Sequence, residues 1–432
     1  MLTYLKQIWS SKDLRKKILF TLGIVILYRF LAHITVPGAN LESLQAISNR
    51  NQLLEVFSLL TGGSTENFSI VLMGIGPYIN ASIIMQLLQV IVPKLENISK
   101  EGESGRRKIN SYTRWLAFPL AFLQSYGMII LLNQQSQIPI ISDINNPSVV
   151  LPIMLTISAG TIFLVWLGEQ ITENGIGNGI SVLIFSSIIS GIPGSIGQSL
   201  ALAQGDESKL IPFIGIVLLT VILITVVVLV NEAQRKIPIT YAGGGMKAKS
   251  DQSFLPIRIN QAGMIPIIFA VALISFPGVL GQFFTQAESA WLRDVGNTMV
   301  TIFQPNTFSY LILYYIFVLA FTYFYVSITF NPEQVAENIQ KRGGYIPGIR
   351  PGTQTVEHLK TVSSHLTLFG SNFLALIAIM PLLTQFVFTS SAIGSITLLI
   401  SGAGIIIIVG VVLEIVRQIN AQLIMHDYKR FY

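Results

Sequence analysis

The sequence predicts an all-α, polytopic membrane protein with ten transmembrane helices. Hydrophobic residues make up 51% of the 432 residues and charged residues only 11%, whereas a soluble domain carries about 25% charged residues. The mean hydropathy is +0.64. The apolar residues form long runs, and a helix needs about 20 of them to cross the hydrocarbon core. Most of this chain is therefore expected to face lipid or other membrane helices.

Ten apolar runs are long enough to cross a membrane. Backbone groups inside lipid must satisfy their own hydrogen bonds, so we expect helices rather than open strands. The first run has no small-residue cleavage site and is too long for a signal peptide, so we expect it to be retained. The predicted spans are 18–36, 69–92, 113–133, 149–168, 179–199, 210–230, 262–283, 308–330, 368–389 and 392–416.

The basic residues indicate the orientation, because cytoplasmic connections of membrane proteins are rich in Lys and Arg. The chain has 27 Lys and Arg residues. All of them lie in the connections assigned to the cytoplasm, with Arg114 counted there, except Arg29, Arg50, Lys209 and Arg293. We therefore expect both termini in the cytoplasm. The cytoplasmic segments are 1–17, 93–112, 169–178, 231–261, 331–367 and 417–432.

The spans divide into two sets of five. Residues 1–200 contain spans one to five, and residues 201–432 contain spans six to ten with the large loops 231–261 and 331–367. This division permits two inverted halves around a central path, as in many transport proteins.

Several kinds of site are not expected. The chain has no cysteine, which excludes disulfides and thiolate chemistry. The histidines His33, His358, His365 and His426 are scattered and form no metal-binding pair. We therefore expect no metal, no cofactor and no enzyme activity.

Two polar stretches of the chain have a simple structural interpretation as well as a functional one. Phe68 to Trp115 ends in a loop of mixed charge that suits a positive-inside anchor. Trp166 to Phe185 contains three alternate glycines, but they follow a membrane helix and lack the spacing of a nucleotide-binding loop. We expect a tight turn there. Glu169 and Glu173 could ligate a cation, although capping of the helix is the simpler interpretation.

The third cytoplasmic segment, Asn331 to Thr367, is too long for a simple connection. Asn331 is expected to cap a short helix with Pro332 at its first position. Gly343 and Gly344 should end this helix. The following segment places Arg350 between two Pro-Gly turns, which would present its side chain on a rigid tip. Such a tip suits docking to a partner, and a solvated loop charge is the alternative.

The polar segments resemble the SecY family, whose members are protein-conducting channels. The similarity extends over nearly the whole chain in order. It is carried by short sequence motifs in or next to the polar connections. These are EGESGRRK with YTR, WLGEQITENGIGNGIS, NEAQRKIPITYA, INQAGMIPIIFA and FNPEQVAENIQKRGGYIPGIRPGTQT. The resemblance implies an hourglass channel that passes unfolded polypeptide across the membrane or sideways into lipid.

The resemblance also implies site residues. An idle pore needs an apolar constriction against ion leakage. Residues 52–64 match the family's plug, with Gly62 and Gly63 as its hinge. Asn80, Ser82, Gln86, Asn260 and Gln261 match a polar seam at the lateral gate. The positions that match the pore ring are Ile75, Ile79, Ile180, Ile184, Ile268 and Ile407.

The partners are likewise implied by the resemblance. Energy for transport would come from the SecA motor ATPase or a translating ribosome. The small subunits SecE and SecG, signal peptides, nascent polypeptide and the lipid bilayer complete the expected partners. Basic side chains suit docking to polyanionic ribosomal RNA. The candidates are Arg106, Arg107, Lys108, Lys341, Arg342 and Arg350.

Two other classes were weighed against the channel. A secondary transporter would place ionisable residues at mid-membrane, and only Arg29 and Glu414 approach that position in the sequence. An intramembrane protease would need a catalytic pair at span depth, and His33 has no evident serine partner. The long loop with its rigid arginine favours the channel.

Overall fold

The structure is a computed structural model, and it describes most of the chain. The candidate plug, residues 52–64 with Gly62 and Gly63, lies outside the described residues. The described ranges are 7–38, 67–135, 139–141, 146–204, 210–241, 253–285, 287, 289–304, 307–388 and 402–431.

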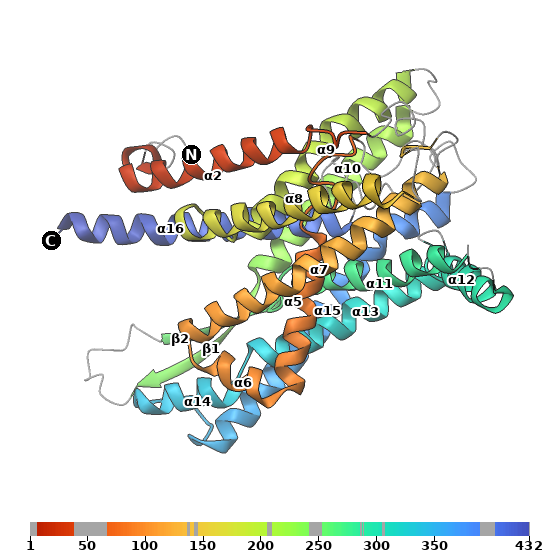
Figure 1. The fold of residues 1–432 in the computed structure, drawn as a ribbon. Coiled ribbons are helices and arrows are strands. Elements are labelled where there is room, and N and C mark those ends of the chain that lie inside the picture. Colours follow the sequence, from red (N-terminus) through yellow and green to blue (C-terminus); the bar gives the residue numbers. More distant parts are fainter. Residues whose placement is uncertain are drawn as a thin grey trace. The chain divides into compact units, whose positions relative to one another are not determined.

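A helix lies over each of the ten predicted spans (Figure 1). Among the described residues, five of these helices are long and apolar enough to cross a membrane, namely α8, α10, α13, α15 and α16. The multi-pass prediction is thereby supported. The ten helices are α2 (Lys12–Leu31), α5 (Gly76–Ile91), α7 (Glu103–Gln135), α8 (Pro147–Asn174), α9 (Gly179–Gln204), α10 (Leu210–Glu232), α11 (Ile265–Phe284), α13 (Phe308–Thr329), α15 (Thr353–Phe388) and α16 (Gly402–Phe431).

The second predicted span is only partly helical. Gly74 has a φ of +53°, and α5 begins at Gly76 with a proline in its first turn. The segment before it is not helical, and Val36 N donates to Phe68 O at 2.9 Å. Gly160 of α8 lies so close that a Cβ there would be 2.0 Å from Ile70 O. Close packing against α8 therefore covers backbone that has no helix of its own.

The predicted cytoplasmic connection at 93–112 is mostly helical. Pro93 begins the short helix α6 (Pro93–Lys100), which is bent by 102° from α5. Helix α7 then starts at Glu103, well before the predicted span. The apolar pattern marks only the part of α7 that is hydrophobic enough to face lipid. The polar first turns of this helix were therefore not predicted.

The chain forms two compact units. One contains Met1–Leu210, Ala272–Tyr310 and Ile407–Tyr432, and the other contains Ile211–Val271 and Leu311–Ile406. These units are defined by spatial proximity, so the inverted halves 1–200 and 201–432 stay a prediction.

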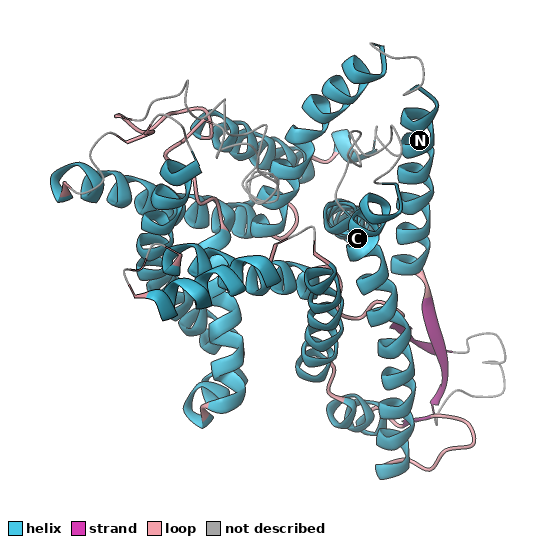
Figure 2. Ribbon diagram, turned by 90° about the vertical axis from the view of Figure 1, so that its right-hand side faces the viewer, coloured by secondary structure: helices cyan, strands magenta, loops and turns pink. Residues whose placement is uncertain are grey.

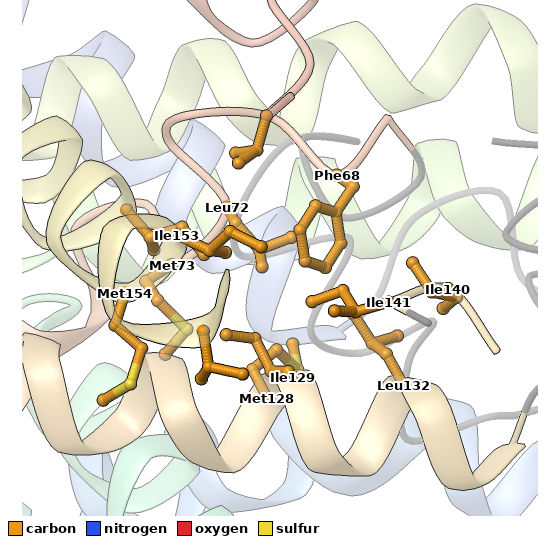
Figure 3. Close-up of a cluster of buried hydrophobic side chains, with 13 residues drawn as sticks. Phe68, Leu72, Met73, Met128, Ile129, Leu132, Ile140, Ile141, Ile153 and Met154 are labelled. Atoms are coloured by element: carbon orange, nitrogen blue, oxygen red, sulfur yellow. The ribbon is translucent and has the colours of Figure 1, made fainter. Parts of the chain in front are cut away.

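The first unit has a core between the segment preceding α5 and the helices α7 and α8 (Figure 3). Phe68 and Leu72 are fully buried against Ile129 and Ile153. Asn133, near the end of α7, accepts a hydrogen bond from Ile141 N at 3.0 Å. This bond turns the chain back so that the isoleucine joins the same core. The first unit also contains α12 (Ala290–Ile302), which packs on α11 through Gly281 and Gly296.

The second unit contains a small three-stranded sheet that the sequence analysis missed (Figure 2). The strands β1 (Gln234–Tyr241) and β2 (Ser253–Arg258) are antiparallel, and β3 (Gly344–Tyr345) pairs with the end of β1. The two large connections that were predicted to be cytoplasmic are therefore joined in one platform. Its core contains Ile237, Ile257, Ala336, Ile346 and Leu359.

Candidate docking platform and channel helices

Arg350 lies on a tip whose base is fixed in the platform core. Ile346 is buried there, and Ile349 packs against the same cluster. Gly348 and Gly352 have φ values of +82° and +101°, a region that favours glycine. The hydroxyl of Thr355 donates to Arg350 O at 3.0 Å. The Arg350 side chain is exposed, so a fixed backbone presents a cation to solvent.

The short helix α14 (Pro332–Lys341) precedes this tip, as the sequence predicted. Asn331 caps it by accepting from Gln334 N at 3.2 Å. Lys341 pairs with Glu337 at 2.7 Å, and Arg342 beyond it is exposed. The helix packs on α15 through Ala336 and Ile339, which are buried. The platform therefore carries three basic side chains on supported backbone.

The other predicted docking cations lie at the start of α7. Arg106, Arg107 and Lys108 are all exposed. Arg107 pairs with Glu103 at 2.9 Å, and Lys108 with Glu101 at 3.1 Å. Exposed ion pairs contribute only about 0–1 kcal/mol to stability. An anionic partner could therefore replace these carboxylates at little cost.

The glycine-rich segment between α8 and α9 is a tight turn, as expected, and its contacts are structural. A Cβ on Gly179 would lie 1.7 Å from Gly168 O, and one on Gly175 would lie 2.5 Å from the Thr21 hydroxyl. Gly177 has a φ of +85° and its N–H donates to the Gln418 side chain. The turn thus joins α2, α8, α9 and α16, and glycine permits the close approach.

Glu169, near the C-terminal end of α8, pairs with Arg114 of α7 at 2.9 Å. No group of three metal-ligating side chains occurs among the described residues. The ion pair gives Glu169 a structural role between two helices.

The predicted ring residues lie in or directly before helices, and both units contain some of them. Ile75 precedes α5 and is buried, while Ile79 lies one turn later. In α9, Ile180 lies against Gly168 of α8 and Ile184 is 4% exposed. Ile407 of α16 is also buried, and Ile268 lies on α11 in the second unit. Their convergence on one constriction stays a prediction.

The predicted gate residues form hydrogen bonds within their own units. Gln86 donates to Ser82 one turn earlier on α5 at 3.2 Å, and Asn80 is half-buried on the same helix. Asn260 donates to Asn231, at the end of α10, at 2.7 Å.

Gln261 accepts from Ser363 of α15 at 3.2 Å. The sequence did not indicate the partners Asn231 and Ser363, because they are distant in the chain and ordinary in composition.

Sequence analysis also missed Arg29 as a contact residue. Its guanidinium contacts backbone carbonyls of α9. A lone basic residue within an apolar run is a signal that could have marked it, since such residues are costly in membranes.

The fold and these segments define a class: a multi-pass helical membrane protein with a structured platform outside its apolar helices. A family model described as SecY matches residues 69–416. The chain is 39% identical to the "Protein translocase subunit SecY" of Staphylococcus epidermidis, over 98% of this chain and 97% of the relative. Its identity to the protein of that name from Pseudomonas aeruginosa is also 39%, over 98% and 93%. The chain therefore belongs to the SecY family.

Solved structures agree with this fold. A structure titled "The structure of a protein conducting channel" matches with a TM-score of 0.65 and 20% identity, covering 94% of this chain and 92% of the other. Sec61 in a canine ribosome-channel complex matches with a TM-score of 0.62 and 21% identity, with the same coverage. The comparison supports the helical arrangement independently of close sequence identity.

Replacing Gly179 by alanine is expected to destabilise the turn between α8 and α9. The added Cβ would lie 1.7 Å from Gly168 O, and overpacking of this kind costs about 1–3 kcal/mol. Thermal unfolding of the purified protein in detergent would measure the loss. Gly191 is the matched control, because a Cβ there meets nothing within 4 Å. Gly191→Ala should leave the midpoint unchanged or raise it, and equal midpoints for both variants would contradict the packing argument.

Proposed function

We propose that this chain is the channel subunit of a protein translocase. It conducts unfolded secretory polypeptides across the cytoplasmic membrane and releases hydrophobic helices sideways into the bilayer. The observation that carries this proposal is the 39% identity, over 98% of the chain, to a relative named as a translocase subunit. The SecY family is a channel family, and the chain is accordingly a conduit rather than an enzyme.

The energy for transport comes from a partner that docks on the cytoplasmic platform. Similar solved channels include Sec61 in a ribosome-channel complex and yeast Ssh1 bound to an 80S ribosome. These ribosome complexes of similar channels support a ribosome as one partner. The SecA motor is the second, and SecE and SecG are the small subunits that complete the channel.

The exposed cations explain how such partners are recognised. Arg350 stands on a backbone held by Ile346 and Ile349, so little conformational freedom is lost when it binds. Arginine contacts phosphate and carboxylate groups through two parallel hydrogen bonds. Arg342 and the cations at the start of α7 add long-range attraction for a polyanion.

Passage itself requires a seal that binds no particular sequence. The six isoleucines Ile75, Ile79, Ile180, Ile184, Ile268 and Ile407 form this ring in our proposal. Branched apolar side chains exclude water when the pore is idle and can close around a threaded chain. The polar residues Asn80, Ser82, Gln86, Asn260 and Gln261 line the lateral gate, and residues 52–64 form the plug with Gly62 and Gly63 as its hinge.

Arg350→Glu is expected to leave the protein inserted while blocking export. The substitution removes a charge-assisted contact of about 1.5–3 kcal/mol, which corresponds to roughly 10- to 100-fold weaker docking. Export of a secretory precursor into inverted membrane vesicles measures the effect, with the amount of inserted protein as reference. Lys360→Glu, an exposed reversal on α15, is the control and should export normally. Normal export by Arg350→Glu would remove the docking role.

Serine substitution of Ile180 and Ile184 together should increase ion leakage through the idle channel. Two hydroxyls lower the cost of wetting the constriction, while an extended chain can still pass. Ion flux from proteoliposomes is the measurement, and we expect at least a several-fold rise. Ile189→Ser on the exposed side of α9 is the control. An unchanged leak in the double variant would contradict the ring assignment.

The proposed orientation places both termini in the cytoplasm. The chain has no cysteine, so single cysteines can be labelled without background. Cysteines at the exposed positions Ser104 and Thr353 should react with an impermeant maleimide only from the cytoplasmic side. Those at Ser148 and Thr298, also exposed, should react only from outside. Reversed labelling of either pair would contradict the ten-span topology.

A further inference from the structure

Helix α2 contacts α9 through a membrane arginine. The Nη2 atom of Arg29 donates to Ser186 O at 2.5 Å and faces Ser187 O at 3.2 Å. It also contacts the hydroxyl of Ser190, which itself donates to Ser187 O at 2.8 Å. The guanidinium therefore engages one full turn of α9 (Ser186 to Ser190).

Tyr28 strengthens the same contact. Its hydroxyl lies 2.6 Å from Ser187 Oγ, and Ser187 Oγ donates to Leu183 O at 3.1 Å. The two hydroxyls therefore share a hydrogen bond. The tyrosine side chain is 1% exposed. Two adjacent residues of α2 therefore bind the same turn of α9, and we call this contact the outer clamp.

A second contact joins α2 to the turn that precedes α9. The hydroxyl of Thr21 accepts a hydrogen bond from Ile176 N at 3.1 Å and donates to Lys17 O at 2.9 Å. Gly175, next to it, has no room for a Cβ because the Thr21 oxygen is so near. We call this contact the inner clamp.

The two clamps bracket the ring residues of α9. Ile180 and Ile184 lie in sequence between Ile176 at the inner clamp and Ser186 at the outer clamp. On α2, Thr21 and Arg29 are eight residues apart, about 12 Å along a helix. Helix α2 therefore contacts the chain on both sides of Ile180 and Ile184, at the turn before α9 and at Ser186 to Ser190 within it.

A cation at this depth is costly unless its hydrogen bonds are satisfied. Carbonyl oxygens have two lone pairs, so Ser186 O and Ser187 O can accept from Arg29 while remaining in the helix ladder. All three contacts are made by the single atom Nη2 of Arg29, and the planar guanidinium fixes the direction of the N–H groups on this atom. Lysine would keep the charge, but its ammonium is more strongly hydrated and stands on a more flexible side chain.

We propose that Arg29 is a positioning residue that holds the pore-lining part of α9 in place, and thereby sets the seal of the idle channel. This proposal rests on the proposed function of Ile180 and Ile184. Arg29 acts through α9 and does not itself contact the passing polypeptide.

The test compares variants of Arg29 in the complete channel, reconstituted in proteoliposomes. Arg29→Met has similar length and no donors, and it should raise ion leakage several-fold. Arg29→Lys should give an intermediate leak. Arg15→Met removes an exposed cation from the cytoplasmic end of the same helix and should match the wild type.

A second measurement follows the helix contact itself. Spin labels at Phe30 of α2 and Ile189 of α9, both exposed, report the distance between the helices by electron-electron resonance. Arg29→Met should broaden this distance distribution, and Arg29→Lys should broaden it less. Tyr28→Phe removes one hydrogen bond with the packing kept, so it provides a milder variant if Arg29→Met fails to fold, and it too should broaden the distribution.

The outcomes separate this inference from the proposed function. If the distance distribution stays unchanged in Arg29→Met, or in Tyr28→Phe when the first variant does not fold, the clamp is overturned, whatever the leak. If the distribution broadens and the leak rises, the proposal is supported. If the distribution broadens but Arg29→Met does not leak, the link to the seal is overturned. A leak in the serine double variant then leaves the ring assignment standing, and the lack of one removes the ring assignment as well.

Discussion

Inside the bilayer, each backbone hydrogen-bonding group must find its partner within the protein, and the rest of this structure depends on that constraint. It makes each predicted span a helix. It also explains the exception before α5, where the chain is not helical between Phe68 and Ile75. That segment is covered by protein, since Phe68 and Leu72 are fully buried and Gly160 lets α8 approach Ile70 O. Irregular backbone persists at this depth because a neighbouring helix replaces the solvent.

The same constraint gives glycine a second use in this chain. Gly168, Gly175 and Gly179 allow helix ends and a turn to meet without side chains between them. Close backbone approach adds van der Waals contact, which is a main source of helix association in lipid. The turn between α8 and α9 resembles a ligand-binding loop in sequence, yet its glycines lie against backbone and side chains of α2, α8 and α16.

The spans and the docking tip could be predicted from the sequence because their signals are local. Long apolar runs mark spans, and Asn331 followed by Pro332 marks a helix start that the structure confirms. The sheet was missed because β3 has only two residues and β1 pairs with it from about a hundred positions earlier in the chain. Ile237 and Ile257 point into one core only after those loops meet. Asn260 likewise pairs with Asn231, which lies 29 positions earlier in the chain.

Polar contacts are distributed unevenly, and the distribution fits a channel that must be firm in some places and able to move in others. Helix α2 contacts the turn before α9 through Thr21, and α9 itself through Tyr28 and Arg29. On α5, by contrast, Gln86 bonds to Ser82 of its own helix. A hydrogen bond within one helix survives when that helix moves as a body, whereas a bond between helices must break. The contacts around α9 therefore resist displacement, and the polar face of α5 can separate from a neighbour without losing this bond. The proposed seal on α9 and the proposed gate on α5 would thus each lie where the hydrogen bonds suit that function.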